Sequence, residues 1–179
     1  MAKRGETREK ILGAAAQLAA EHGISATAVD DIAAEAGVAK GSVYYNFGSK
    51  ERLYAELLGE TLQRAGQRLR ESLDGARPGD AVRAVAEAFL RGLQEHPSSS
   101  KVVAAELFRL DRPWRESLAE YRSLFFSIFA EALEADGRPA SPANAAAVFG
   151  STIMVGFERM LFADRLDLEE AIAAIEGAD

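Results

Sequence analysis

Apolar residues recur every three or four positions along the whole chain, and this spacing constrains the fold more than any other feature. Near the N-terminus, Ile11, Leu12 and Ala15 fall on one face of a helix, and Leu18 and Ala19 continue that face. No stretch alternates apolar and polar residues between hairpin turns, as the strands of a half-exposed sheet do. Five prolines among 179 residues also favour helices. The sequence therefore predicts an all-α protein.

Glycine, proline and capping residues divide the helical pattern into about nine segments. Thr7 is the expected N-cap of the first helix, and Gly23 is its expected end. Thr27 and Asp30 resemble a capping box at the start of a second, short helix, which ends at Gly37. The remaining boundaries are expected at Ala39, Gly48–Ser49, Gly75, His96–Pro97, Pro113, Gly137–Pro142 and Asp167.

The composition argues against an enzyme or a metalloprotein. The chain has no cysteine, which excludes disulfides, thiolate metal sites and a cysteine nucleophile. Its two histidines, His22 and His96, do not lie in a metal-ligand spacing. The sequence contains no P-loop, no Gly-x-Ser-x-Gly nucleophile motif and no dinucleotide-binding glycine motif. We therefore predict no catalytic residue, no metal site and no cofactor.

The sequence also lacks the marks of a membrane or exported protein. No apolar run approaches the roughly 18 residues that a membrane-spanning helix needs. The first ten residues, MAKRGETREK, lack the apolar stretch of a signal peptide. We therefore expect a cytoplasmic protein without a membrane partner.

The net charge of −7 is unevenly distributed along the chain. Residues 1–54 hold seven basic and seven acidic side chains, so the rest of the chain carries the whole net charge. An acidic body is repelled by a polyanion, whereas a neutral N-terminal module can approach one. This distribution permits a nucleic-acid partner but does not identify it.

The second and third predicted helices are short and are joined by a tight turn at Gly37 and Val38. This is the layout of a helix-turn-helix. In that motif the second helix enters the major groove of DNA, and its N-terminal residues touch base edges. Val43 and Phe47 lie four residues apart and are expected to hold the inner face of this helix, which leaves polar and aromatic residues on its outer face.

These outer residues form most of the predicted DNA contacts. Thr27, at the start of the second predicted helix, and Lys50, at the start of the fourth, complete them. Lys40 suits a guanine edge or a phosphate, and tyrosines suit phosphates through their hydroxyls and thymine methyl groups through their rings. Helix N-termini favour phosphates through their N–H groups and dipole. Taken singly, each tyrosine also fits a packing role and Lys40 a solvated surface role. The predicted contacts are Thr27, Lys40, Gly41, Ser42, Tyr44, Tyr45, Asn46 and Lys50.

The region from Thr7 to Tyr54 reads TREKILGAAAQLAAEHGISATAVDDIAAEAGVAKGSVYYNFGSKERLY. Its motifs T-A-V-D-D-I-A-x-x-A-G-V and K-G-x-V-Y-x-x-F-x-S-K-E-x-L strongly resemble the N-terminal domain of the TetR family of bacterial repressors. The resemblance implies a DNA-binding domain over residues 1–48 and a helical ligand-binding and dimerisation domain over residues 49–179. Asn46 departs from the histidine or tyrosine of many members, which leaves the operator sequence open.

An aromatic stripe runs along the seventh predicted helix, which Pro113 is expected to start just before Trp114. One interpretation is ordinary hydrophobic core. The other is the wall of an effector cavity, since ligand sites between helices are mostly apolar with a few polar groups. Glu106 and Arg109 would join Trp114 and Tyr121 in supplying those groups. The predicted ligand-binding residues are Phe89, Leu93, Phe108, Trp114, Tyr121, Phe125 and Phe157.

The eighth predicted helix, which begins at Ser141, is apolar nearly all round, so a monomer would leave one of its sides uncovered. We expect this helix and the last one to form a two-fold homodimer interface. Gly150, Ser151 and Gly156 would allow the two backbones to approach closely.

Together these features predict a ligand-responsive repressor that binds a pseudo-palindromic, double-stranded DNA operator as a dimer and is released by a small hydrophobic or aromatic effector. One alternative is a DNA-binding regulator controlled by a protein partner. Another is a helical enzyme or scaffold that carries a vestigial helix-turn-helix. The effector, the operator sequence and the regulated genes do not follow from these residues.

Overall fold

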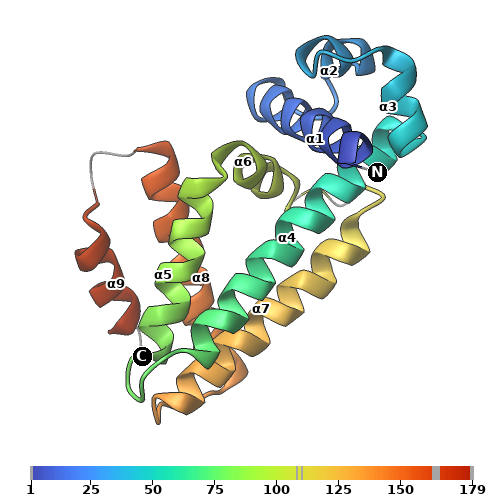
Figure 1. The fold of residues 1–179 in the computed structure, drawn as a ribbon. Coiled ribbons are helices and arrows are strands. Elements are labelled where there is room, and N and C mark those ends of the chain that lie inside the picture. The colour runs from blue at the N-terminus through green and yellow to red at the C-terminus, as the bar shows by residue number, and fades with distance from the viewer. Residues whose placement is uncertain (1, 108, 110, 163–165, 178–179) are drawn as a thin grey trace. The chain divides into compact units, whose positions relative to one another are not determined.

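The computed structural model describes residues 2–107, 109, 111–162 and 166–177. Within these residues the chain forms nine helices and no strand, which confirms the predicted all-α fold (Figure 1). The helices are α1 (Ala2–His22), α2 (Val29–Glu35), α3 (Lys40–Phe47), α4 (Lys50–Asp74), α5 (Ala81–Glu95), α6 (Pro97–Glu106), α7 (Arg115–Ala135), α8 (Pro142–Leu161) and α9 (Leu168–Glu176). In the part of the chain so described, no helix is both long and apolar enough to cross a membrane.

Several predicted helix boundaries are confirmed by their capping geometry. The Ser141 hydroxyl accepts a hydrogen bond from the Asn144 backbone N–H at 3.1 Å, at the start of α8. The Asp167 carboxylate caps α9 by accepting hydrogen bonds from the backbone N–H groups of Glu169 and Glu170 at 2.9 and 3.2 Å. Gly23 and Gly37 follow α1 and α2 with φ of +80° and +66°, the left-handed conformation that glycine adopts most readily.

Two predicted caps are wrong. Thr7 does not begin the first helix, because α1 already starts at Ala2 and Thr7 lies inside it. Thr27 does not cap the second helix, whose N-cap is Ala28, and the box carboxylate is that of Asp31, which accepts from the Ala28 N–H at 3.4 Å. The Thr27 hydroxyl instead donates to the carbonyl oxygen of Gly23 at 2.9 Å, which satisfies a group at the end of α1.

The two prolines at expected boundaries have different outcomes. The boundary at His96–Pro97 is confirmed: α5 ends at Glu95, and Pro97 is the first residue of α6, where the N–H that proline lacks would be unpaired anyway. Pro113 does not start the seventh helix. The backbone N–H of Arg115 closes a turn onto the carbonyl of Arg112, and α7 begins at Arg115, after Trp114.

The chain divides into two compact units. The first unit comprises residues 1–61 and 98–118, and the second comprises residues 62–97 and 119–179. The first unit therefore holds α1 to α3, the first part of α4 and α6. The second holds α5, α8 and α9 with most of α7 and the rest of α4. The assignment of DNA binding to residues 1–48 and of ligand binding and dimerisation to residues 49–179 stays a prediction.

In the first unit, α1 and the start of α4 enclose a core of fully buried side chains. Tyr54 is fully buried and its hydroxyl donates to the carbonyl oxygen of Ala15 at 3.3 Å. Burial raises the pKa of Tyr54 to about 12. On the surface, Arg8 pairs with Glu56 at 2.7 Å and with Glu60, and its guanidinium lies 5.5 Å from the centre of the Phe47 ring. These contacts tie α1, α3 and α4 together.

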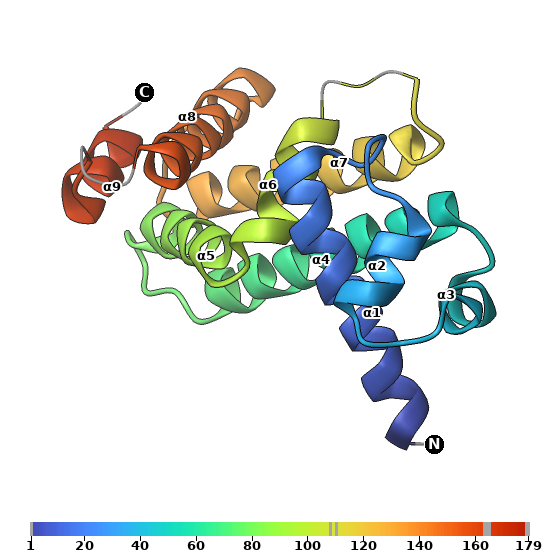
Figure 2. The ribbon, with the colours of Figure 1, turned by 90° about the horizontal axis from the view of Figure 1, so that it is seen from above.

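In the second unit, α5, α8 and α9 pack against one another, and Figures 1 and 2 both show α8 beside α9. The ring of Phe149 is the centre of an aromatic cluster whose other members are Phe89, Phe125, Phe126 and Phe129, at centroid distances of 6.0, 5.9, 5.2 and 5.3 Å. Most of these pairs meet edge to face, which is a favourable aromatic geometry. The aromatic residues of α7 thus join rings of α5 and α8 in the core.

The two glycines expected at a dimer interface occupy different environments on α8. Gly156 is buried against α5, where a methyl group in place of its hydrogen would lie 2.3 Å from Leu93 and 3.3 Å from Leu90. The expectation that Gly156 faces a second copy is therefore wrong, because this position is filled within the chain. A methyl group at Gly150 would have no protein atom of the described residues within 4 Å.

Candidate nucleic-acid interface

The turn between α2 and α3 is short and closed by backbone hydrogen bonds. The N–H of Val38 donates to the carbonyl of Ala33 at 2.9 Å, and the N–H of Gly37 donates to that of Ala34 at 3.1 Å. Ala39 then takes an extended conformation and α3 begins at Lys40. Because these bonds satisfy the last carbonyls of α2, the turn fixes the direction in which α3 leaves it.

The inner and outer faces of α3 are those that the sequence predicts. Val43 and Phe47 are buried, with exposed fractions of 2% and 3%. On the other side, Tyr45 is 72% exposed and Tyr44 is 45% exposed. Most of Tyr45 and nearly half of Tyr44 are therefore open to a binding partner. Single exposed apolar residues are common on protein surfaces, so it is the position of the two tyrosines beside Lys40 on one helix that indicates an interaction surface.

Lys40, the first residue of α3, is exposed but already paired. Its ammonium nitrogen lies 3.0 Å from both carboxylate oxygens of Asp30 on α2. The hydrogen bond that Lys40 donates to Asp30, together with the negative charge of that carboxylate, raises the pKa of Lys40. Nothing in the sequence indicates this partner, since Asp30 fits a capping box there equally well. Only the α2–turn–α3 geometry brings residues ten apart into contact.

The other predicted contacts on α3 differ in how available they are. A side chain at Gly41 would meet no described atom within 4 Å, so the backbone there is open to a close approach. Ser42 and Asn46 are partly exposed, and the Asn46 amide donates to the carbonyl oxygen of Ser42 at 2.7 Å. This bond uses one amide N–H of Asn46 and leaves the other N–H and the side-chain carbonyl oxygen for a base edge.

The two predicted contacts outside α3 lie in contrasting environments. Lys50, in the first turn of α4, is partly exposed and its ammonium approaches the Ser25 carbonyl oxygen at 3.4 Å. Thr27 is 3% exposed and its hydroxyl is bonded to Gly23, so its side chain holds the turn before α2. The Thr27 hydroxyl could donate to a phosphate only if that bond broke.

A polar network that the sequence did not reveal supports the same turn. Arg112 donates to the Ser25 hydroxyl at 2.8 Å and to the Glu106 carboxylate at 3.0 Å. The Glu106 side chain is only 3% exposed, and Arg112 is 16% exposed. The Arg112 guanidinium also lies 5.6 Å from the centre of the Trp114 ring. The segment between α6 and α7 is thereby fastened to the α1–α2 turn within the first unit.

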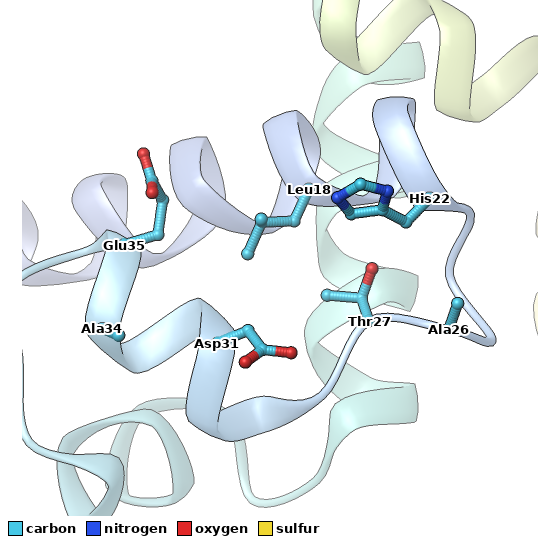
Figure 3. A pocket seen from close by; sticks show the side chains of 7 residues that line it. All are labelled: Leu18, His22, Ala26, Thr27, Asp31, Ala34 and Glu35. Carbon is cyan, nitrogen blue, oxygen red and sulfur yellow. The ribbon is translucent and has the colours of Figure 1, made fainter.

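A shallow pocket of 420 Å³ lies between α1 and α2 (Figure 3). Figure 3 shows Leu18 and His22 of α1 on one side and Thr27 and Asp31 on the other. The remaining lining residues are Ala26, Ala34 and Glu35. Among the described residues, no three His, Cys, Asp or Glu side chains are placed to hold a metal ion. Its carboxylates and exposed position distinguish this pocket from the apolar effector cavity that the sequence predicts.

The described residues among the predicted ligand contacts belong to both compact units. Phe89 and Phe125 meet in the aromatic cluster around Phe149, a residue that the sequence prediction did not include. Leu93, Tyr121 and Phe157 are partly exposed residues of the second unit.

Trp114 belongs to the first unit and is 4% exposed. Its indole N–H has no hydrogen-bond partner among the described residues. The predicted ligand contact Phe108 lies outside the described residues, so the structure does not place it.

Comparison with known proteins bears on this helix-turn-helix. A sequence profile of the bacterial regulatory proteins of the tetR family matches residues 11–57. The chain is 30% identical over 162 residues to the HTH-type transcriptional regulator LmrA of Bacillus subtilis (strain 168), covering 85% of this chain and 84% of LmrA. It is 34% identical over 117 residues to the HTH-type transcriptional repressor KstR2 of Mycobacterium tuberculosis (strain ATCC 25618 / H37Rv), covering 65% of this chain and 58% of KstR2.

Solved structures share the fold. The structure described as a SmeT–triclosan complex superposes with a TM-score of 0.75, covering 94% of this chain and 89% of SmeT. The two sequences are 19% identical, so this likeness concerns the fold.

Proposed function

This chain belongs to the tetR family of bacterial regulatory proteins, a non-enzymatic family of transcriptional regulators, and we propose that it is a repressor that binds a pseudo-palindromic DNA operator as a homodimer. The observation that carries the proposal is the division of α3 between two buried apolar residues, Val43 and Phe47, and an exposed face that bears Lys40, Tyr44 and Tyr45. An exposed face of this composition suits phosphates and base edges.

In the proposed complex, α3 of each protomer lies in the major groove of one operator half-site. Lys40, Gly41 and Ser42 occupy its N-terminal turn, the part of a recognition helix that contacts bases. Lys50 and the tyrosine hydroxyls contact phosphates on either side. A two-fold symmetric dimer places its two recognition helices about 34–36 Å apart, one turn of DNA, and so requires a pseudo-palindromic site. Such a regulator acts in the cytoplasm, where the bacterial chromosome lies.

The proposed dimer forms through α8 and α9. Four small or apolar residues of α8 are exposed at helical spacing: Ala143, Ala147, Gly150 and Met154. Met154 is 65% exposed, and the space next to Gly150 is open. A methionine beside small residues forms an adaptable apolar surface on which a second helix can pack closely.

The proposed effector is a small hydrophobic or aromatic molecule that binds the body of the protein. Two features support it: the aromatic cluster of Phe89, Phe125 and Phe149, and the complex of triclosan with SmeT, a protein of the same fold. An effector that binds one body conformation better than the other releases DNA by that difference in affinity. A coupling of about 5- to 150-fold is ordinary for such a switch.

Selection from a pool of randomised DNA duplexes tests the proposal. We expect the wild-type protein to enrich a pseudo-palindrome whose half-site centres are about 10–10.5 base pairs, or a multiple of this, apart. The double variant Lys40→Ala/Tyr45→Ala should enrich no sequence while remaining a folded dimer. If the wild-type protein enriches no sequence, the proposed function is wrong.

The effector is tested separately on the selected operator. Triclosan and a panel of other apolar aromatic compounds are titrated into the protein–operator complex, and release of DNA is followed by fluorescence anisotropy. We expect at least one compound to weaken operator binding by about fivefold or more. If no compound releases DNA while a protein from the same cell does, the regulator answers to a protein partner instead.

A further inference from the structure

Two lysines of the proposed DNA-binding surface are held in different ways. The ammonium of Lys40 contacts both carboxylate oxygens of Asp30 at 3.0 Å. The ammonium of Lys50 donates to an uncharged carbonyl, that of Ser25, at 3.4 Å, and its charge also acts on the neighbouring Glu51 carboxylate. Lys40 is thus held directly on a carboxylate, whereas the hydrogen bond of Lys50 goes to a neutral backbone group.

We propose that Asp30 is a specificity-determining residue: it keeps Lys40 from binding arbitrary phosphates and releases it only where a base edge replaces the carboxylate. This inference rests on the proposed DNA-binding function. It adds Asp30, which is not one of the predicted DNA contacts. The Asp30 side chain is 67% exposed and lies in the first turn of α2. Lys40 begins α3, so the pair bridges the two helices of the motif.

The charge balance gives the physical reason. Non-specific affinity for DNA comes from lysines and arginines that neutralise phosphates and release their counterions. A lysine that remains on a carboxylate neutralises no phosphate. A lysine that leaves it exposes a negative charge beside the DNA backbone, which repels the phosphates. Either way, Asp30 removes the contribution of Lys40 to binding at sites that lack a matching base.

A matching site offers Lys40 a better acceptor. The O6 and N7 atoms of a guanine form a pair of acceptors in the major groove that a lysine can contact together. The two oxygens of Asp30 hold the ammonium in a comparable two-acceptor contact before DNA binds. Exchange of the carboxylate for a guanine edge therefore preserves the number of acceptors around the ammonium, whereas exchange for a single phosphate oxygen does not.

The variant Asp30→Asn tests the inference, and Asp31→Asn is its matched control. Both changes remove one negative charge from the first turn of α2. Asp31 accepts from the Ala28 N–H and makes no ion pair with Lys40, and an asparagine at 31 retains a carbonyl acceptor for that bond. Any difference between the two variants thus reports on Lys40 rather than on net charge.

Affinity is measured for poly(dA–dT), whose major groove lacks the adjacent O6 and N7 acceptors of guanine, and for the duplex that the wild type selects from a random pool, at 50 and 200 mM salt. We expect Asp30→Asn to add about one phosphate contact per protomer on poly(dA–dT), which steepens the salt dependence by about 0.9 per contact. The ratio of the affinities at 50 and 200 mM salt should therefore rise by about 3.5-fold per protomer, or by about 12-fold for a dimer. Affinity for the selected duplex should change less, so discrimination falls.

A double-mutant cycle identifies the partner. In a Lys40→Met background, Asp30→Asn should change poly(dA–dT) affinity no more than Asp31→Asn does, because no lysine remains to be released. Equal effects of the two asparagine variants in the wild-type background, or an undiminished Asp30→Asn effect without Lys40, would overturn the inference. Failure of the wild type to select any duplex refutes the proposed function instead, and the poly(dA–dT) comparison still decides the role of Asp30.

Discussion

The outer faces of α3 and α8 are exposed in different ways, and the difference indicates what each face is for. Both helices bury apolar residues on one side, Val43 and Phe47 in α3 and Val148 and Phe149 in α8. On the other side α3 presents Lys40 with two tyrosines, whereas α8 presents small residues and a methionine. A face that offers charge and hydroxyl groups suits a polyanion with hydrogen-bonding edges. A smooth apolar face suits a second protein surface.

Met154→Arg is expected to have the largest effect, because it places a charge in the proposed α8 interface. In a two-fold dimer the two arginines would be desolvated without partners, at a cost of several kcal/mol for each. We expect monomers at micromolar concentration in sedimentation velocity, with helix content unchanged by circular dichroism. Arg122→Met on α7, which removes an exposed charge, should leave the dimer intact. A wild-type monomer, or a Met154→Arg dimer of full affinity, would contradict the proposed interface.

Lys40→Ala and Tyr45→Ala should have the next largest effect, and should affect DNA binding alone. For Lys40, loss of one good base contact weakens binding by about 5- to 150-fold per half-site, and a dimer loses two. For Tyr45, loss of a phosphate contact weakens binding to every DNA sequence. We expect both variants to remain folded dimers, because both side chains are exposed. Anisotropy with the selected duplex measures the loss. Lys10→Ala, another exposed lysine paired with a carboxylate, is the control and should bind normally. Unchanged affinity of both α3 variants would refute the interface.

The features that could be predicted from the sequence are those that depend on neighbours along the chain. A glycine such as Gly37 ends a helix because of its own backbone freedom, and Ser141 caps one through an N–H only three residues away. The same locality explains the two faces of α3, since Val43 and Phe47 are four residues apart on an eight-residue helix. Element type and the two faces of α3 were therefore predicted correctly.

The features that could not be predicted depend on which helices meet. Asp30 and Lys40 pair only because the turn brings α2 onto α3, and Arg112 binds Ser25 across 87 residues of sequence. Gly150 and Gly156 both lie among apolar residues in the sequence. Only the packing of α5 against α8 shows that Gly156 is buried and Gly150 is not. The capping box failed for a related reason. The Thr27 hydroxyl could either accept a hydrogen bond from an N–H at the start of α2 or donate one to another group. In the structure it donates to the Gly23 carbonyl oxygen at the end of α1.

Substitutions at the two glycines of α8 should have smaller effects, and they compare its buried face with its exposed face. Gly156→Ala should lower the free energy of unfolding by about 1–3 kcal/mol, since its methyl group would lie 2.3 Å from Leu93. Gly150→Ala meets no described atom of the same chain and should not destabilise the protomer, because alanine is the better helix former. It should instead weaken the dimer if α8 packs closely on its copy. Urea unfolding and sedimentation separate these outcomes, and equal loss of protomer stability in both variants would contradict them.

Asn46→Ala should have the smallest effect, although Asn46 shares α3 with Lys40. Asn46 is the seventh of eight residues in this helix, far from the N-terminal turn that contacts bases, and its amide already donates to the Ser42 carbonyl at 2.7 Å. Alanine loses that bond but gains helix propensity, so stability should change by less than about 0.5 kcal/mol. We expect operator affinity to fall by less than about fivefold, below the least that a good base contact contributes. A loss as large as that of Lys40→Ala would mean that Asn46 contacts a base edge, and that specificity extends along the whole of α3.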